Sequence, residues 1–282
     1  MIQTVTVGGF PLVGADSLGG FWRLMDLQGW HDGVSLRRNR QDRAQQDGAW
    51  ASTGFRSGRP ITLSGMARFG NAANAKFASR NFRAIVGNSH ADMMVIDSGG
   101  EVHATVELDG DLKVVWLNEL MFNWTVLLYA TDPLLYGAAV SGSASLSNVT
   151  AGAGRTWPRV WPTSYGITPG TTPGSIGLPN VGSAAYWPTL RVDGPVPNPT
   201  ITCNQSGAWV RYNGTVLAGQ WLTVDCANRR VLLNGQVSVR SRVTSSGDWL
   251  SIAPGGGSLS WAADAADPAA KLSVYGFQGA WL

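Results

Sequence analysis

The stretch Asp193-Gly-Pro-Val-Pro-Asn-Pro199 leads into a series of evenly spaced short strands that continues to the end of the chain. Its three prolines fix φ and remove backbone donors, so we expect an extended segment at the edge of a sheet. Turn signals such as Asn213-Gly214 and Asn234-Gly235 separate the strands, because these residues tolerate positive φ. The expected strands are Trp209–Tyr212, Trp221–Cys226, Val231–Leu233, Val237–Val239, Trp249–Ile252, Leu259–Trp261 and Leu272–Tyr275. Short strands at a spacing of roughly ten residues predict a β-sandwich or jelly roll.

The N-terminal half is predicted to be α+β, with one helix over residues 71–87. Asn71 is a suitable N-cap and Gly87 a suitable C-cap for this segment. Apolar residues recur between them at helical spacing, namely Ala75, Ala78, Phe82 and Ile85. The periodicity predicts that this face of the helix packs on a core.

Strands are expected to surround this helix. Residues Glu101–Leu108 alternate between apolar and polar side chains, so one face of this strand is predicted to be buried and the other wet. Asp92–Asp97 precedes it after the turn Ser98-Gly-Gly100, and Leu112–Trp116 follows it after Asp109-Gly110. Short turns of this kind favour hairpins, so we expect the three strands to form a meander.

Length and composition indicate two domains. A chain of 282 residues corresponds to about two domains of ~150 residues. Residues 138–190 are rich in Gly, Ser, Thr and Pro, which predicts a linker, the first strands of a second domain and a long loop. We therefore expect domains over residues 1–137 and 138–282. Charged residues make up only 14% of the chain, below the ~25% of typical soluble domains. This suits a subunit that is buried in an assembly, although a Gly- and Ser-rich β protein from a GC-rich genome has the same composition.

One local excess of positive charge stands out. The chain has a net charge of only +3, but Arg37, Arg38, Arg40 and Arg43 lie within seven residues. Arg56 and Arg59 follow them shortly afterwards. Such a run can contact phosphates, yet it has no interleaved aromatic residues and no recognisable motif. The pattern favours an exposed arm or subunit contact over specific binding of nucleic acid.

No catalytic or metal-binding pattern is found. Ile96-Asp-Ser-Gly-Gly100 is similar to the sequence around the nucleophile of trypsin-like proteases, but a hairpin turn is expected there and no histidine stands in a matching context. Glycoside hydrolysis needs two carboxyl groups, and all glutamates lie in the first half. The spacings typical of zinc, calcium and phosphate sites are absent from the sequence. We therefore predict that the chain is not an enzyme and needs no cofactor or metal.

The sequence contains no secretory signal pattern and no run of ~20 apolar residues, so we expect production in a cytoplasm and no membrane insertion. Cys203 and Cys226 are predicted to be buried thiols in that reducing compartment. A disulfide between the two is the alternative, which sequence alone does not decide.

Motifs in the second half occur in a familiar order. Asn198-Pro199 is followed by Leu222-Thr-Val-Asp225, by Asn234-Gly235 and by Trp249-Leu-Ser-Ile-Ala-Pro-Gly255. This order resembles the C-terminal domain of siphophage distal tail proteins, also called Dit proteins or minor tail proteins. Leu127-Leu-Tyr-Ala-Thr-Asp-Pro133, with Tyr136, resembles the strand that closes the first domain of that family.

The resemblance implies a mainly β protein of two domains: a split-barrel-like ring domain akin to the tail tube subunit, and a galectin-like β-sandwich. It further implies a homo-hexameric ring at the tail tip of the virion, assembled in the host cytoplasm, with DNA passing through its channel. The implied partners are the tail tube protein, the tape measure protein, the tip or hub protein and receptor-binding proteins. We expect the subunit interface to include the arm arginines Arg37, Arg38, Arg40, Arg43, Arg56 and Arg59.

The alternative function is that of a carbohydrate-binding module that contacts the host surface. Eight of the thirteen tryptophans follow residue 150, and exposed indoles can stack on sugars. Trp157 and Trp161 are the best candidates for an exposed pair. This half contains neither His nor Glu, however, and most of its tryptophans stand within strand patterns that favour a core role.

Overall fold

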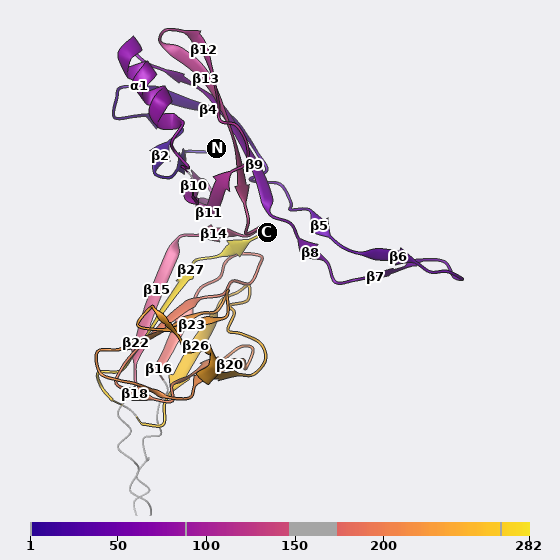
Figure 1. Cartoon of the computed structure of the whole chain (residues 1–282), viewed down its shortest axis with the longest axis vertical. Helices are drawn as coiled ribbons and strands as arrows, with labels where there is room; N and C mark the ends of the chain where they lie inside the picture. Colours follow the sequence, from indigo (N-terminus) through magenta and orange to yellow (C-terminus); the bar gives the residue numbers. More distant parts are fainter. Residues whose placement is uncertain (1, 88, 147–173, 266) are drawn as a thin grey trace, which may run out of the picture. The chain divides into compact units, whose positions relative to one another are not determined.

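The chain forms two units, shown in Figure 1 as a computed structural model that describes residues 2–87, 89–146, 174–265 and 267–282. Unit 1 comprises Met1–Ala138 with Trp281–Leu282, and unit 2 comprises Ala139–Ala280. Both are built mainly of antiparallel strands, so the predicted mainly β fold is confirmed. None of the helices in the described residues is long and apolar enough to cross a membrane.

Unit 1 is organised around one large antiparallel sheet, in which the order is β2-β1-β10-β11-β13-β9-β4-β3. Its longest pairing joins β9 and β13 over ten residues, from Met121 opposite Arg68 to Ala130 opposite Arg59. Every second residue of both strands is buried, because successive side chains point to opposite faces of a sheet. The strands are β1 (Thr4–Val7), β2 (Phe10–Pro11), β3 (Gly14–Ala15), β4 (Phe21–Gln28), β9 (Arg59–Arg68), β10 (Ala91–Asp97), β11 (Gly100–Leu108), β12 (Lys113–Asn118), β13 (Met121–Ala130), β14 (Leu135–Gly137) and the C-terminal β28 (Ala280–Trp281).

The single α-helix of the described residues, α1 (Ala72–Phe82), lies beside this sheet (Figure 1). Its N-cap is Asn71, as predicted, because the side-chain Oδ1 accepts a hydrogen bond of 2.7 Å from Ala73 N. The predicted end at Gly87 was wrong: the α-helix stops at Phe82. The next turn is tighter, since Ala84 N bonds to Asn81 O at 3.0 Å, three residues back, so the four-residue pattern of an α-helix is lost.

Aromatic side chains form the centre of the unit 1 core. The Trp22 ring is fully buried, and its Nε1 donates a hydrogen bond of 2.9 Å to Asp16 Oδ2, so the polar edge of the indole is satisfied. Five rings surround it at centroid distances of 5.0 to 6.1 Å: Phe10, Phe69, Phe82, Phe122 and Trp124. Phe82 belongs to α1, so this cluster attaches the helix to the sheet.

The expected three-strand meander was wrong in its last strand. β10 and β11 do form a hairpin around Ser98, with Asp97 opposite Gly100. β12, however, pairs with β13 and not with β11. The far edge of β11 is occupied by β13 and β14, while β12 and β13 are joined by a short turn in which Asn118 Oδ1 accepts from Leu120 N at 2.9 Å. The short turn closes a local hairpin at little entropic cost.

A long excursion leaves unit 1 between β4 and β9. It contains β5 (Leu36–Arg37), β6 (Arg40–Asp42), β7 (Ala49–Ala51) and β8 (Phe55–Arg56). β5 pairs with β8 and β6 pairs with β7, so the segment is one extended hairpin with two short ladders (Figure 1). We call residues 35–57 the arm.

Unit 2 consists of a six-stranded sheet in the order β15-β27-β17-β22-β23-β24 and a five-stranded sheet in the order β16-β26-β19-β20-β25. Buried residues alternate in both, for example Leu190 and Val192 in one sheet and Leu259 and Trp261 in the other. This is the predicted β-sandwich. Its elements are β15 (Ala139–Ser145), β16 (Gly174–Leu178), β17 (Thr189–Asp193), β18 (Val196–Pro197), β19 (Thr200–Cys203), β20 (Trp209–Tyr212), β21 (Thr215–Val216), β22 (Trp221–Asp225), β23 (Arg230–Leu233), β24 (Val237–Ser238), the 3-10 helix η1 (Arg240–Arg242), β25 (Val243–Ser245), β26 (Gly257–Ala262) and β27 (Lys271–Phe277).

Six of the seven strands expected from the sequence are present in unit 2, and one is not. The proline-rich stretch is extended as predicted, and among the described strands β18 pairs only with β21. Trp249–Ile252 is not a strand, and only Ile252 makes an isolated bridge, to Tyr186. Trp249 and Leu250 are both buried, and two consecutive buried side chains break the alternation of a half-buried strand.

We predict that the aromatic cluster determines the stability of unit 1. Phe82→Ala should lower the free energy of unfolding by about 3–5 kcal/mol, because it removes a fully buried ring and leaves a cavity between α1 and the sheet. Phe77→Ala is the control on the same helix, since this ring is 53% exposed, and it should change stability by no more than about 0.5 kcal/mol. Hydrogen exchange of β9 and β13 amides measures unit 1 specifically. Equal effects of the two substitutions would contradict the role given to Phe82.

Candidate functional site

The arm is the most exposed ordered segment of unit 1. Every residue from 35 to 53 is exposed, and the arm carries the large apolar side chains of Leu36, Trp50 and Phe55 at 49%, 67% and 67% exposure. The sequence predicted an exposed arm or subunit contact without interleaved aromatic residues. The hairpin corrects this, because it pairs Phe55 with Arg37 and Trp50 with Gln41 across the two ladders. The signal was missed because Trp50 and Phe55 lie on the returning strands, outside the run Arg37 to Arg43, and face it only through the hairpin pairing.

Five of the six predicted interface arginines lie on the surface of this arm. Arg37 and Arg56 belong to the ladder nearer the sheet, Arg40 belongs to the outer ladder, and Arg38 and Arg43 flank the strands. The Arg43 guanidinium lies 4.6 Å from the centroid of a Trp50 ring, in a cation–π contact. None of these five arginines forms an ion pair with another residue that the structure describes.

Arg59, the sixth predicted interface residue, is only 2% exposed and therefore does not belong to the arm surface. Its Nη1 donates to the backbone oxygens of Gly29, Trp30 and Asp32 at 2.8, 3.1 and 2.6 Å, and its Nη2 donates to Pro133 O at 3.3 Å. Burial lowers the pKa of the guanidinium, and the nearby Asp32 carboxylate acts in the opposite direction. Arg59 is thus a structural cation at the base of the arm.

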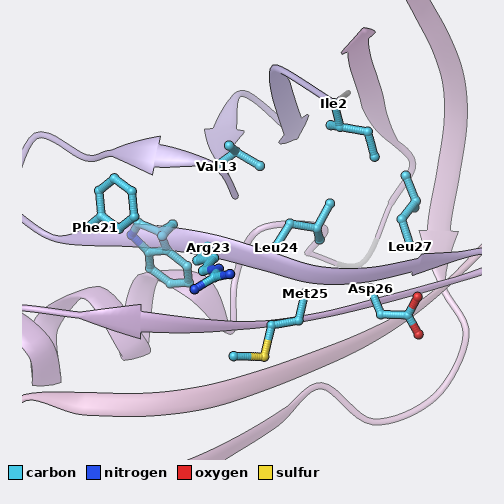
Figure 2. A pocket seen from close by; sticks show the side chains of 9 residues that line it. Ile2, Val13, Phe21, Arg23, Leu24, Met25, Asp26 and Leu27 are labelled. Atoms are coloured by element: carbon cyan, nitrogen blue, oxygen red, sulfur yellow. The ribbon is translucent and has the colours of Figure 1, made fainter.

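A groove of about 630 Å³ runs along β4, next to Ile2 and Val13 (Figure 2). Leu24 and Leu27 extend toward these two residues, whereas Met25 points away from them. The register of β4 shifts between Leu24 and Asp26, so Met25 occupies a β-bulge. β3 pairs with the first two residues of β4, Phe21 and Trp22. No other described strand pairs with the rest of this edge of β4, so its backbone groups are left without a strand partner. The groove therefore combines apolar side chains with unpaired backbone, which is the usual template for adding a strand.

The described residues contain no group of three His, Cys, Asp or Glu side chains that could hold a metal. Ser98 lies in the β10–β11 turn, where Asp97 Oδ1 accepts a hydrogen bond from Gly99 N at 2.7 Å. Asp264, a carboxylate of unit 2, pairs with Arg211 at 3.2 Å. Trp157 and Trp161, the predicted sugar contacts, lie outside the described residues. The prediction that the chain is not an enzyme stays a prediction.

Both cysteines are buried free thiols. Burial raises the pKa of the Cys226 thiol far above its ordinary value, with a smaller contribution from the Asp225 carboxylate. Cys203 and Cys226 are each only 1% exposed, so both have a packing role in this structure.

His103 forms a charged cluster on the β10–β11 hairpin. Its Nδ1 lies 2.9 Å from Asp92 Oδ2 and its Nε2 lies 2.7 Å from Glu101 Oε1. Burial alone lowers the pKa of the imidazole, but the hydrogen bonds to Glu101 and Asp92 outweigh it, and the net effect is a raised pKa.

Comparisons with known proteins agree with this architecture. Residues 181–273 match the family model of the siphovirus-type tail component, C-terminal domain, of the SPP1 Dit type. The crystal structure of the Dit protein of phage SPP1, described as a paradigm of the hub adsorption apparatus in phages that infect Gram-positive bacteria, is 12% identical, with a TM-score of 0.64 and 99% of both chains covered. Two structures of the phage P2 baseplate in its activated conformation, with Ca and with Sr, are 9% and 11% identical, each with a TM-score of 0.51, 90% of this chain and 89% of the other covered. No curated protein matches the sequence.

The match over residues 181–273 supports a structural component of a phage tail, and the likeness to the solved Dit structure shows that the fold is shared along the chain. More particularly, the resemblance to the siphophage distal tail proteins is confirmed, and the protein is assigned to the virion tail on this basis.

We predict that Arg59→Ala destabilises unit 1 by about 3 kcal/mol, because it leaves four backbone oxygens without their donor. Arg56 is exposed on β8, so Arg56→Ala is the control and should lower the free energy of unfolding by no more than about 0.5 kcal/mol. Hydrogen exchange of β9 amides gives both values. An Arg59→Ala variant as stable as Arg56→Ala would show that the cation is dispensable.

The raised pKa of His103 predicts a pH dependence of a definite sign. A raised folded-state pKa stabilises the protein fully below the unfolded-state pKa, and this stabilisation is lost as the pH rises through the folded-state pKa. His103→Gln should therefore lower the Tm of unit 1 more at pH about 5.5 than at pH about 8.5. His31→Gln, at an exposed position without a side-chain hydrogen bond to any described residue, is the control. A His103→Gln effect that is independent of pH would refute the assignment.

Proposed function

We propose that this chain assembles into a homo-hexameric ring at the tail tip, where it joins the tail tube to the tip complex. The first domain, residues 1–137, is the ring-forming domain in this proposal. The second, residues 138–282, faces outward as a docking platform for receptor-binding proteins. Its further partners are the tail tube, tape measure and tip or hub proteins, assembly takes place in the host cytoplasm, and DNA passes through the channel. The family match and the shared fold with a hub protein and with baseplate components support this proposal.

The observation that carries the proposal is the arm. Trp50 and Phe55 are both 67% exposed, and the neighbouring arginines have no ion-pair partners in the described part of the chain. Burying two such rings against a neighbour is worth about 1.5–3 kcal/mol for each side chain. A hairpin that extends from the sheet with apolar and cationic side chains in water is suited to a contact with another subunit.

The groove along β4 is the acceptor that we propose for the arm of the neighbouring copy. It offers the apolar side chains of Leu24 and Leu27, an unpaired strand edge, and the Asp26 carboxylate at its rim to complement the arginines. The arm and the groove are different surfaces of one chain, so their contact is head-to-tail. Contacts of this type close into a ring when the rotation between neighbours divides a full turn.

Charge reversal of the arm tests this proposal. Six copies of 29.9 kDa give a ring of about 179 kDa, which light scattering and negative-stain imaging detect. We expect Arg37, Arg38, Arg40 and Arg43, all changed to Glu, to yield monomers, because the arm then loses its attraction to the Asp26 carboxylate of the groove. The same four positions changed to Lys keep the charge and should keep the ring. Unimpaired rings in the Glu variant would remove the arm from the interface, and a wild-type chain that stays monomeric at all concentrations would contradict self-assembly.

A further inference from the structure

Four separate loops of unit 2 meet around a polar cavity of about 490 Å³. They are the segment before β17, the β19–β20 and β22–β23 turns, and the segment after β25. The cavity walls include Trp187, Ser206, Arg229, Asp248 and Ser251. Converging loops on a rigid sandwich are a common position for binding sites, because the scaffold fixes side chains that do not contribute to its core.

Backbone hydrogen bonds hold these loops in place. Tyr186, which precedes Trp187, is bonded in both directions to Ile252, at 3.1 and 2.8 Å. Ser246 Oγ accepts from Trp209 N at 3.1 Å, which connects the segment after β25 to β20. The β22–β23 turn is fixed by Asp225, whose Oδ1 accepts from Asn228 N at 3.0 Å. A cavity with walls fixed in this way loses little conformational entropy when it takes up a ligand.

The cavity walls combine an exposed indole with charged and hydroxyl side chains. Trp187 is 42% exposed, so a face of its indole is available to a ligand. Arg229 and Asp248 are exposed and, within the described residues, neither side chain has an ion-pair or hydrogen-bond partner. Arg can only donate hydrogen bonds and an ionised Asp can only accept them, while Ser251 can do both. The cavity thus has an apolar platform surrounded by separate donors and acceptors.

A pyranose ring has the complementary surface, with an apolar C–H face and a rim of hydroxyl groups that each donate and accept. Adjacent hydroxyls can bond to Asp248 and Arg229 while the C–H face rests on Trp187. An anionic ligand would meet the Asp248 carboxylate and a cationic one the Arg229 guanidinium, and an apolar segment would leave both charges unpaired at a desolvation cost. We therefore propose that this cavity is a binding site for a neutral hexopyranose glycan. It uses neither the arm nor Trp157 and Trp161, and it does not depend on ring formation.

Saturation-transfer NMR with the full chain tests the site. The probes are glucose, galactose, mannose, N-acetylglucosamine and the disaccharides of each, at millimolar concentrations. We expect a signal from at least one of them, and roughly tenfold weaker binding of that sugar by Trp187→Ala and by Asp248→Asn. Both positions are exposed, so the fold should be retained.

The matched control is Trp50→Ala, which removes an equally large exposed indole from the arm and should leave sugar binding unchanged. The absence of a signal from every sugar, or a signal that Trp187→Ala and Asp248→Asn retain, would overturn the proposal. So would an equal loss of binding in Trp50→Ala, since the signal would then come from nonspecific contact with indoles.

Discussion

The arm depends on one buried cation at its base. Arg59 is the first residue of β9 and stands opposite Ala130, at the end of the ten-residue pairing with β13. Its guanidinium binds the backbone after β4 and the backbone at Pro133, so a single side chain connects the three places where strands leave the sheet. A buried guanidinium is costly unless its donors are satisfied, and here Nη1 and Nη2 have carbonyl partners while the buried Nε has none among the described residues. The carbonyl oxygens around it are therefore a constraint on the path of the chain at the point where the arm begins.

The features that could be predicted from the sequence were those encoded in neighbouring residues. Asn71 was identified as a cap because capping involves only the first turn of a helix. Six of the seven strands expected in unit 2 were found because alternation and turn residues are local. Pairing between distant segments was not encoded in this way, so β12 was assigned to the wrong neighbour. Arg59 was placed on the surface for the same reason, because the oxygens that it binds come from segments around residues 30 and 133. The loops around Trp187 also meet only in three dimensions.

The two units expose different kinds of side chains. In unit 1, the exposed features are large apolar side chains, unpaired arginines and an open strand edge, which suit extended contact with another protein. In unit 2, Trp249 and Trp261 are buried, whereas Trp187 is exposed at a polar cavity between loops. The low fraction of charged residues fits a chain that covers part of its surface on assembly.

Assembly into a ring would raise the total affinity of weak glycan sites for a surface. A cavity with one exposed indole and a few polar groups holds a small sugar with few contacts, and affinity per non-hydrogen atom has an upper limit. In the proposed hexamer, six such sites would meet a surface of repeated glycans together, so that each binding event after the first becomes intramolecular. Linked sites of this kind can exceed the affinity of a single site by about 10²–10⁴ without any new contact. A site that is too weak to matter in the monomer could therefore hold a tail tip at a glycan surface, and each single contact could still be released and formed again elsewhere on that surface.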